Sequence, residues 1–167
     1  MEPFDTDGSS PEPDVFPYAS AAAFRTALRD RFAVIAKSET RYSLDELQRQ
    51  FAYDRALARL FTAPDAASWV LKGAGALLAR LEQARHSKDI DVYFAERSAA
   101  VSDATSALRR NLSRDLGDFF GFEVTKIVPL QEEAKGSRVH VRASLGAQDV
   151  RGLPHRRRGR DGHEWRA

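Results

Sequence analysis

The spacing of apolar residues predicts two long helices in the first third of the chain. Ser20 is a typical helix N-cap, and apolar residues then recur at helical spacing, at Phe24, Leu28, Phe32 and Ile35. Ser43 and Glu46 form the Ser-X-X-Glu pattern of a capping box, in which each residue satisfies a free amide at a helix start. We therefore expect helices over about 20–37 and about 44–62.

The rest of the pattern mixes strands with helices. Trp69-Val-Leu is a short apolar run before a glycine, as in a buried strand that enters a turn, and helix-forming residues resume at Gly75. We expect a strand over about 89–94, a helix over about 100–116, and two paired strands over about 122–128 and 138–145. This order predicts an α/β or α+β fold with a mixed sheet flanked by helices.

Composition excludes several classes of protein. The chain has 167 residues, enough for one domain, and no apolar run approaches the roughly 20 residues of a membrane span. The acidic N-terminus lacks the basic start and apolar stretch of a signal peptide, so we expect a cytoplasmic protein. Because the chain has no cysteine, any metal must be held by oxygen or imidazole ligands.

The two ends of the chain differ in composition from its centre. Residues 1–18 hold four of the seven prolines, which is typical of a disordered leader. Residues 151–167 hold six arginines against Asp161 and Glu164, so the net positive charge of the chain comes from one short tail. The expected organisation is a leader over 1–18, a folded domain over 19–148 and a disordered, Arg-rich tail over 149–167.

Lys72-Gly-Ala-Gly-Ala forms a glycine turn between a predicted strand and a predicted helix. Free backbone amides at such a helix start, together with the helix dipole, attract an anion. Gly73 and Gly75 carry no side chain that would block a phosphate, and Lys72 adds a cation at its edge. The same glycines also suit a simple tight connection, so the turn by itself does not decide between the two.

Asp89 and Asp91 lie two residues apart on a predicted strand, so both carboxylates point to the same face. They could share a divalent cation, and oxygen ligands suit Mg²⁺ or Mn²⁺. A solvated acidic face on an edge strand is the alternative. Together with the preceding glycine turn, the pair favours a metal-assisted nucleotidyl-transfer site. Three further residues between the two motifs are candidates for nucleotide binding: Arg80, Arg85 and Ser87.

Two segments carry a resemblance to a known family: Trp69-Val-Leu-Lys-Gly-Ala-Gly-Ala-Leu-Leu-Ala-Arg80 and Arg85-His-Ser-Lys-Asp-Ile-Asp91. They are similar to the Leu-Lys-Gly-Gly-X-Ala-Leu and Arg-X-Ser/Thr-X-Asp-Ile/Leu-Asp motifs of the AbiEii/AbiGii-type nucleotidyltransferase toxins of type IV toxin–antitoxin systems. Ala74 stands where the family usually has the second glycine of its pair. The pattern of helices and strands extends the likeness to roughly 20–148.

The resemblance implies a polymerase-β-like nucleotidyltransferase fold and the toxin half of a toxin–antitoxin pair. It implies Mg²⁺-dependent transfer of a nucleotide from an NTP to RNA, at the 3′ end of tRNA, and a cognate antitoxin as partner. By this likeness Gly73 and Gly75 would cradle phosphates and Lys72 would assist. Asp89 and Asp91 would bind the metal.

The end of the chain departs from that family. Family members supply a third metal carboxylate from a segment resembling Phe-His-Ile-Asp-Val-Val after the paired strands, whereas this chain continues as Leu153-Pro-His-Arg-Arg-Arg. Suitable codons for this tail would encode Phe-His-Ile-Asp-Val-Val in the next reading frame. We therefore hypothesise a frameshift near residues 148–153 that truncates the fold C-terminally, which the nucleotide sequence of the gene would test.

Three functions remain open from the sequence. The first is an active nucleotidyltransferase. The second is a truncated, inactive remnant that still binds a nucleotide or an antitoxin. The third is a nucleic-acid-binding module that acts through the Arg-rich tail.

Overall fold

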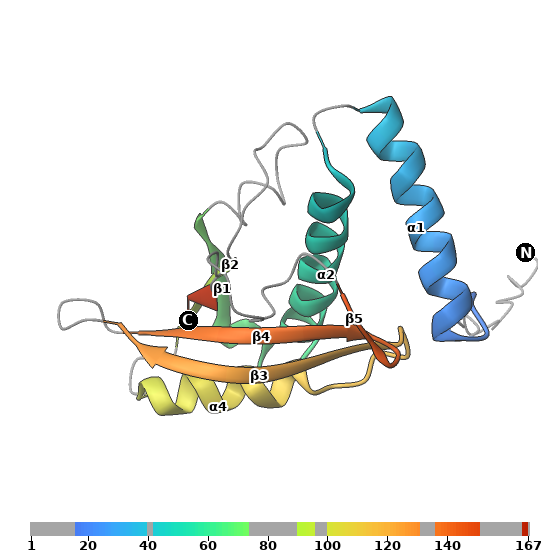
Figure 1. The fold of residues 1–167 in the computed structure, drawn as a ribbon. Coiled ribbons are helices and arrows are strands. Elements are labelled where there is room, and N and C mark those ends of the chain that lie inside the picture. The colour runs from blue at the N-terminus through green and yellow to red at the C-terminus, as the bar shows by residue number, and fades with distance from the viewer. Residues whose placement is uncertain are drawn as a thin grey trace, which may run out of the picture.

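Three α-helices, a short 3₁₀ helix and one mixed sheet make up the part of the chain that the structure describes, and Figure 1 shows their arrangement. The computed structural model describes residues 16–39, 42–73, 90–95, 100–130, 136–150 and 165–166. Within these ranges the elements are α1 (Ala21–Ser38), α2 (Leu44–Phe61), the 3₁₀ helix η1 (Ala66–Ser68), β1 (Trp69–Lys72), β2 (Ile90–Phe94), α4 (Val101–Leu112), β3 (Phe120–Pro129), β4 (Ser137–Leu145), β5 (Gln148–Asp149) and β6 (Trp165–Arg166). The predicted fold class, α/β with a mixed sheet and flanking helices, is confirmed.

The two N-terminal helices begin where the sequence predicts. Ser20 caps α1 by accepting a hydrogen bond from the amide of Ala23 at 3.2 Å. Ser43 and Glu46 form the predicted capping box: the Ser43 hydroxyl accepts from the Glu46 amide at 3.3 Å, and the Glu46 carboxylate accepts from the Ser43 amide at 2.9 Å. Among the described residues, no helix is both long and apolar enough to cross a membrane.

The third long helix ends earlier than predicted. We expected it to reach about residue 116, but α4 ends at Leu112 and Ser113 is its C-cap. The chain then turns through Gly117, whose φ is +70°, and carries Asp118 into the core. Because Asp118 must reach partners on α2, the residues after Leu112 leave the helix although their apolar spacing would continue it.

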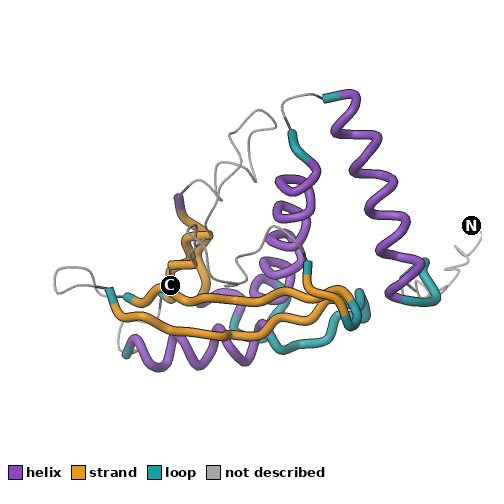
Figure 2. The backbone as a smooth tube through the Cα atoms, in the orientation of Figure 1, coloured by secondary structure: helices purple, strands orange, loops and turns teal. Residues whose placement is uncertain are grey.

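The strands form one sheet in the order β1-β2-β6-β4-β3, with β5 paired to β4. β1 and β2 are antiparallel, and β3 and β4 are the antiparallel pair that the sequence predicts. β6 is parallel to β2 and antiparallel to β4, so a two-residue strand joins the two antiparallel pairs (Figure 2). The predicted helix that starts near Gly75 lies outside the described residues.

Both predicted tails contribute residues to this fold. Phe16 and Tyr18, placed in the leader by the sequence, pack on Phe24 with ring centroids at 4.8 and 4.9 Å. At the other end, Asp149 belongs to β5 and the backbone of Trp165–Arg166 forms β6. Some residues outside 19–148 therefore pack on the domain or pair with its strands. Residues 1–15, 151–164 and 167 lie outside the described ranges.

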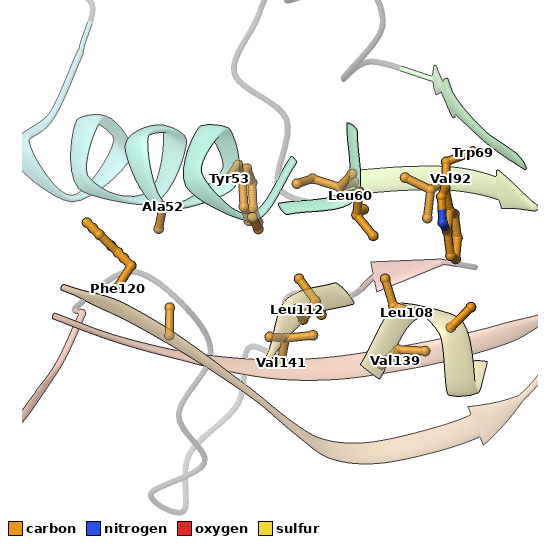
Figure 3. Packing of buried hydrophobic residues seen from close by; sticks show 14 of the residues in the cluster. Ala52, Tyr53, Leu60, Trp69, Val92, Leu108, Leu112, Phe120, Val139 and Val141 are labelled. Atoms are coloured by element: carbon orange, nitrogen blue, oxygen red, sulfur yellow. The ribbon is translucent and has the colours of Figure 1, made fainter. Parts of the chain in front are cut away.

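One apolar cluster joins the sheet to α2 and α4 (Figure 3). Leu60 of α2 and Leu108 of α4 are fully buried, and Val139 and Val141 of β4 are 1% and 2% exposed. Side chains alternate along a strand, so the polar residues of β4 lie on the opposite face. These residues are Arg138, His140, Arg142 and Ser144. The two helices therefore cover one face of the sheet, and the other face carries polar side chains.

A buried ion pair joins α2 to the start of β3. Arg59 is fully buried, and Asp118 is 1% exposed. Arg59 Nη2 donates to Asp118 Oδ1 at 2.8 Å and to the Phe120 carbonyl at 2.7 Å. The other guanidinium N–H groups donate to Asp118 Oδ2 and to the carbonyls of Arg55 and Arg114. All five donors of the guanidinium are thereby satisfied.

The charge of Asp118 depends on these contacts. Burial alone would raise the pKa of Asp118, but hydrogen bonds from Arg59 and Arg55 outweigh burial and lower the pKa below its ordinary value. Arg55 Nε lies 2.7 Å from Asp118 Oδ2. Because the native pKa lies below that of the unfolded chain, about 3.9, the full stabilisation is present above that pH. It is lost as the pH falls through the native pKa.

We expect Asp118→Asn to lower the free energy of unfolding by about 3–5 kcal/mol, because it leaves the Arg59 guanidinium buried without its counter-charge. Urea denaturation at pH 7 measures this change. Glu123→Gln is the control, because it breaks the solvent-exposed pair with Arg142 (3.0 Å) and should cost less than about 1 kcal/mol. Equal stabilities of the two variants would contradict this account of the core.

Candidate active site

The candidate site lies on the antiparallel pair β1–β2. The strand register places Lys72 opposite Asp91 and Val70 opposite Tyr93. The alternate residues of β2, Ile90 and Val92, are buried in the core. Side chains on one strand alternate between faces, so these four partners share the face that α2 and α4 leave uncovered. This part of the chain therefore brings three predicted site residues together: Lys72, Gly73 and Asp91.

Gly73 directly follows β1 and lies against the Asp91 side chain. A Cβ added to Gly73 would overlap Asp91 Oδ2, the nearest atom to that position. The backbone φ of Gly73 is +61°, in the left-handed region that only glycine adopts at little cost. Glycine is therefore required here both by the left-handed backbone and by the carboxylate, which approaches the backbone itself. The role of Gly73 in phosphate binding stays a prediction.

Asp91 is half-buried on this face. Within the described ranges, no side chain or amide donates a hydrogen bond to its carboxylate, and no ion pair joins it to Lys72. A carboxylate that accepts no hydrogen bond from these described residues keeps its oxygen lone pairs available to a cation as far as they are concerned. Asp91 therefore fits the metal-ligand role that its spacing suggested.

The Lys72 ammonium lies over an aromatic ring. Nζ of Lys72 is 4.2 Å from the centroid of the Tyr93 ring, a distance typical of a cation–π contact. Sequence reasoning did not single out Tyr93. The signal was present, because Tyr93 lies two residues after Asp91 on the same strand and must therefore share its face.

The strand next to β2 comes from the Arg-rich tail. β6 pairs Trp165 with Ile90 and Arg166 with Asp91 on one side, and Arg166 with Arg138 on the other. Sequence reasoning expected no strand in this tail, because two residues are too short for an apolar pattern to appear. The position beside Asp91 in the sheet is thus held by an arginine.

The remaining predicted site residues lie outside the described ranges: Gly75, Arg80, Arg85, Ser87 and Asp89. In the part of the chain that the structure describes, no three His, Asp or Glu side chains gather as a metal cluster. The site as described is therefore one carboxylate, one ammonium and one glycine turn on a shared sheet face.

We expect Gly73→Ala to destabilise the protein more than Gly117→Ala does. Both glycines have a left-handed φ, but a Cβ at Gly117 meets no atom within 4 Å, whereas at Gly73 it overlaps the Asp91 carboxylate. The Gly117→Ala change should cost about 1–2 kcal/mol from the backbone alone, and Gly73→Ala should cost more. Chemical denaturation measures both.

The double variant Gly73→Ala/Asp91→Ala isolates the contact. In the Asp91→Ala background, Gly73→Ala should lose the extra destabilisation that comes from overlap with the carboxylate. A double-mutant cycle detects this difference in the free energy of unfolding. Additive effects of the two substitutions would show that Asp91 does not lie against Gly73.

Comparison with known protein families adds to this geometry. The family model for the nucleotidyl transferase AbiEii toxin of type IV toxin–antitoxin systems matches residues 55–157. This is more than half of the chain, and it includes Lys72, Gly73 and Asp91. No curated protein matches the chain. The chain therefore belongs to the AbiEii nucleotidyl transferase toxin family.

Proposed function

We propose that this protein is a toxin that transfers a nucleotide from an NTP to RNA, at the 3′ end of tRNA, with Mg²⁺ or Mn²⁺ as cofactor. One observation carries the proposal: the Lys72–Gly73 turn lies directly against Asp91 on the uncovered face of the sheet. A phosphate-binding turn and a metal-binding carboxylate in contact are the two elements that nucleotidyl transfer requires. The chain belongs to a nucleotidyl transferase family, which agrees with this chemistry.

The glycine turn would bind the triphosphate. Gly73 directly follows β1 and has no side chain, so phosphate oxygens would approach its backbone. Lys72 would neutralise part of the phosphate charge. Four residues beyond the described ranges complete this proposed nucleotide site: Gly75, Arg80, Arg85 and Ser87.

Asp91, with Asp89 two residues before it, would hold the metal ion. When bound, a divalent cation neutralises charge on the triphosphate and on the attacking oxygen of the acceptor. The contribution of this chain is to hold the Asp91 carboxylate in place, which contact with the Gly73 backbone achieves. In the proposed reaction, a 3′-hydroxyl oxygen of the RNA bonds to the α-phosphorus of the NTP and gives up its proton to solvent. The bond from the α-phosphorus to the oxygen that bridges to the β-phosphorus breaks, and diphosphate leaves with that oxygen.

The uncovered face also suits a polyanionic acceptor. β3 and β4 add basic side chains on the side of the sheet that Asp91 occupies, and one of them, Arg142, pairs with Glu123. The basic residues are Lys126, Arg138 and Arg142. RNA phosphates are attracted by such a surface. A cognate antitoxin that silences the enzyme and a cytoplasmic setting, where tRNA is found, belong to the same proposal.

A second candidate is a remnant that binds a nucleotide or an antitoxin without turnover. The position of β6 favours it, because Arg166 rather than a carboxylate is the register partner of Asp91. The family that the sequence resembles takes a third metal carboxylate from a strand that follows the paired strands.

We expect the protein to transfer label from one α-³²P-labelled NTP to total tRNA when Mg²⁺ is present. Asp91→Asn should lower the rate more than about 100-fold, since loss of even a residue that only supports a metal ligand costs 10–100-fold. Asp30→Asn is the matched control: it removes the same charge from an exposed site on α1 and should leave the rate unchanged. NTP binding without label transfer would contradict the proposed enzyme and support the binding remnant. If the protein neither binds an NTP nor transfers label, both candidate functions are contradicted.

A further inference from the structure

Tyr93 occupies an unusual place for an aromatic residue. Its side chain lies on the uncovered face of β2, and the residue is 48% exposed. Val70, its register partner on β1, is 43% exposed, so the ring is not part of the core cluster. Exposed tyrosine on a sheet face contributes little to folding by burial, and its described contact is with a charge.

That contact runs diagonally across the strand pair. Lys72 faces Asp91 directly, and Tyr93 is the next residue on the same face. Opposite charges directly across an antiparallel pair ordinarily attract. Here the Lys72 ammonium instead lies 4.2 Å from the Tyr93 ring centroid, and among the described ion pairs none joins Lys72 to Asp91.

We propose that Tyr93 is a positioning residue that holds the Lys72 ammonium away from Asp91. The contact keeps the carboxylate available for the metal ion and the ammonium available for the triphosphate. Without the ring, the Lys72 ammonium would pair with the Asp91 carboxylate across the strands. The two charges would then neutralise each other, and neither group would be available for the metal ion or the triphosphate. This inference rests on the proposed function, because it assigns a role to Tyr93 within that site.

The geometry has its own test, which needs no ligand. A methylene group beside the face of an aromatic ring is shielded, so the ε-protons of Lys72 should resonate upfield of those of other lysines in the NMR spectrum. Tyr93→Phe should retain this shift, and Tyr93→Leu should abolish it. An unshifted Lys72 in the wild-type protein would overturn the contact.

Binding of Mn²⁺ alone, measured by electron paramagnetic resonance of the free ion, tests the role. We expect Tyr93→Leu to weaken Mn²⁺ binding about two- to fivefold, the effect of an exposed cation–π contact expressed as an affinity ratio. Tyr93→Phe should restore it, since the ring face is retained. Val70→Ala, which truncates the facing residue on β1, should bind Mn²⁺ like the wild type.

The double variant Tyr93→Leu/Lys72→Met separates positioning from a merely structural effect. If Lys72 competes for Asp91 once the ring is gone, removing the ammonium should restore Mn²⁺ affinity. Mn²⁺ affinity that stays low in the double variant, or that does not fall in Tyr93→Leu, would overturn the inference about Tyr93. The metal site itself would still be supported if wild-type Mn²⁺ binding depends on Asp91. Wild-type Mn²⁺ binding that is absent, or unchanged in Asp91→Asn, would instead overturn the metal site and the inference with it.

Discussion

The buried Arg59–Asp118 ion pair is the contact on which the rest of the fold depends. A guanidinium in an apolar core is tolerated only when its charge is balanced and each of its N–H donors has an acceptor. Here Asp118 balances the charge of Arg59, and Asp118 and three backbone carbonyls accept its hydrogen bonds. These partners come from α2, from the segment after α4 and from the first residue of β3. The pair therefore sets where α2 and α4 lie on the sheet, and so which face stays uncovered.

The candidate site on the uncovered face depends on a second, smaller constraint. The backbone at Gly73 passes so close to Asp91 that no side chain fits between them. This contact aligns the end of β1 with β2 and places the Asp91 carboxylate beside the Lys72–Gly73 turn. The scaffold and the site are thus linked: the helices bury one set of side chains of β2, and strand alternation presents Asp91 and Tyr93 on the other.

The sequence predicted the local features well and the long-range ones less well. Helix caps at Ser20 and Ser43 and the β3–β4 pair follow from short patterns, and each was found as predicted. The end of α4 and the burial of Asp118 were missed, because they depend on Arg59, a residue more than fifty positions away. At the site, glycine and carboxylate types suggested the chemistry, but β6 could not be foreseen, since pairing of two residues depends on the sheet edges that receive them.

The central claim is that the Lys72–Gly73 turn and Asp91 form one metal–nucleotide site. Paramagnetic broadening of amide resonances by substoichiometric Mn²⁺ tests it most directly, because broadening falls steeply with distance from the ion. The account predicts that the amides of Lys72, Gly73 and Asp91 broaden first, and that Asp91→Asn removes this pattern. Broadening centred elsewhere, or unaffected by Asp91→Asn, would contradict it.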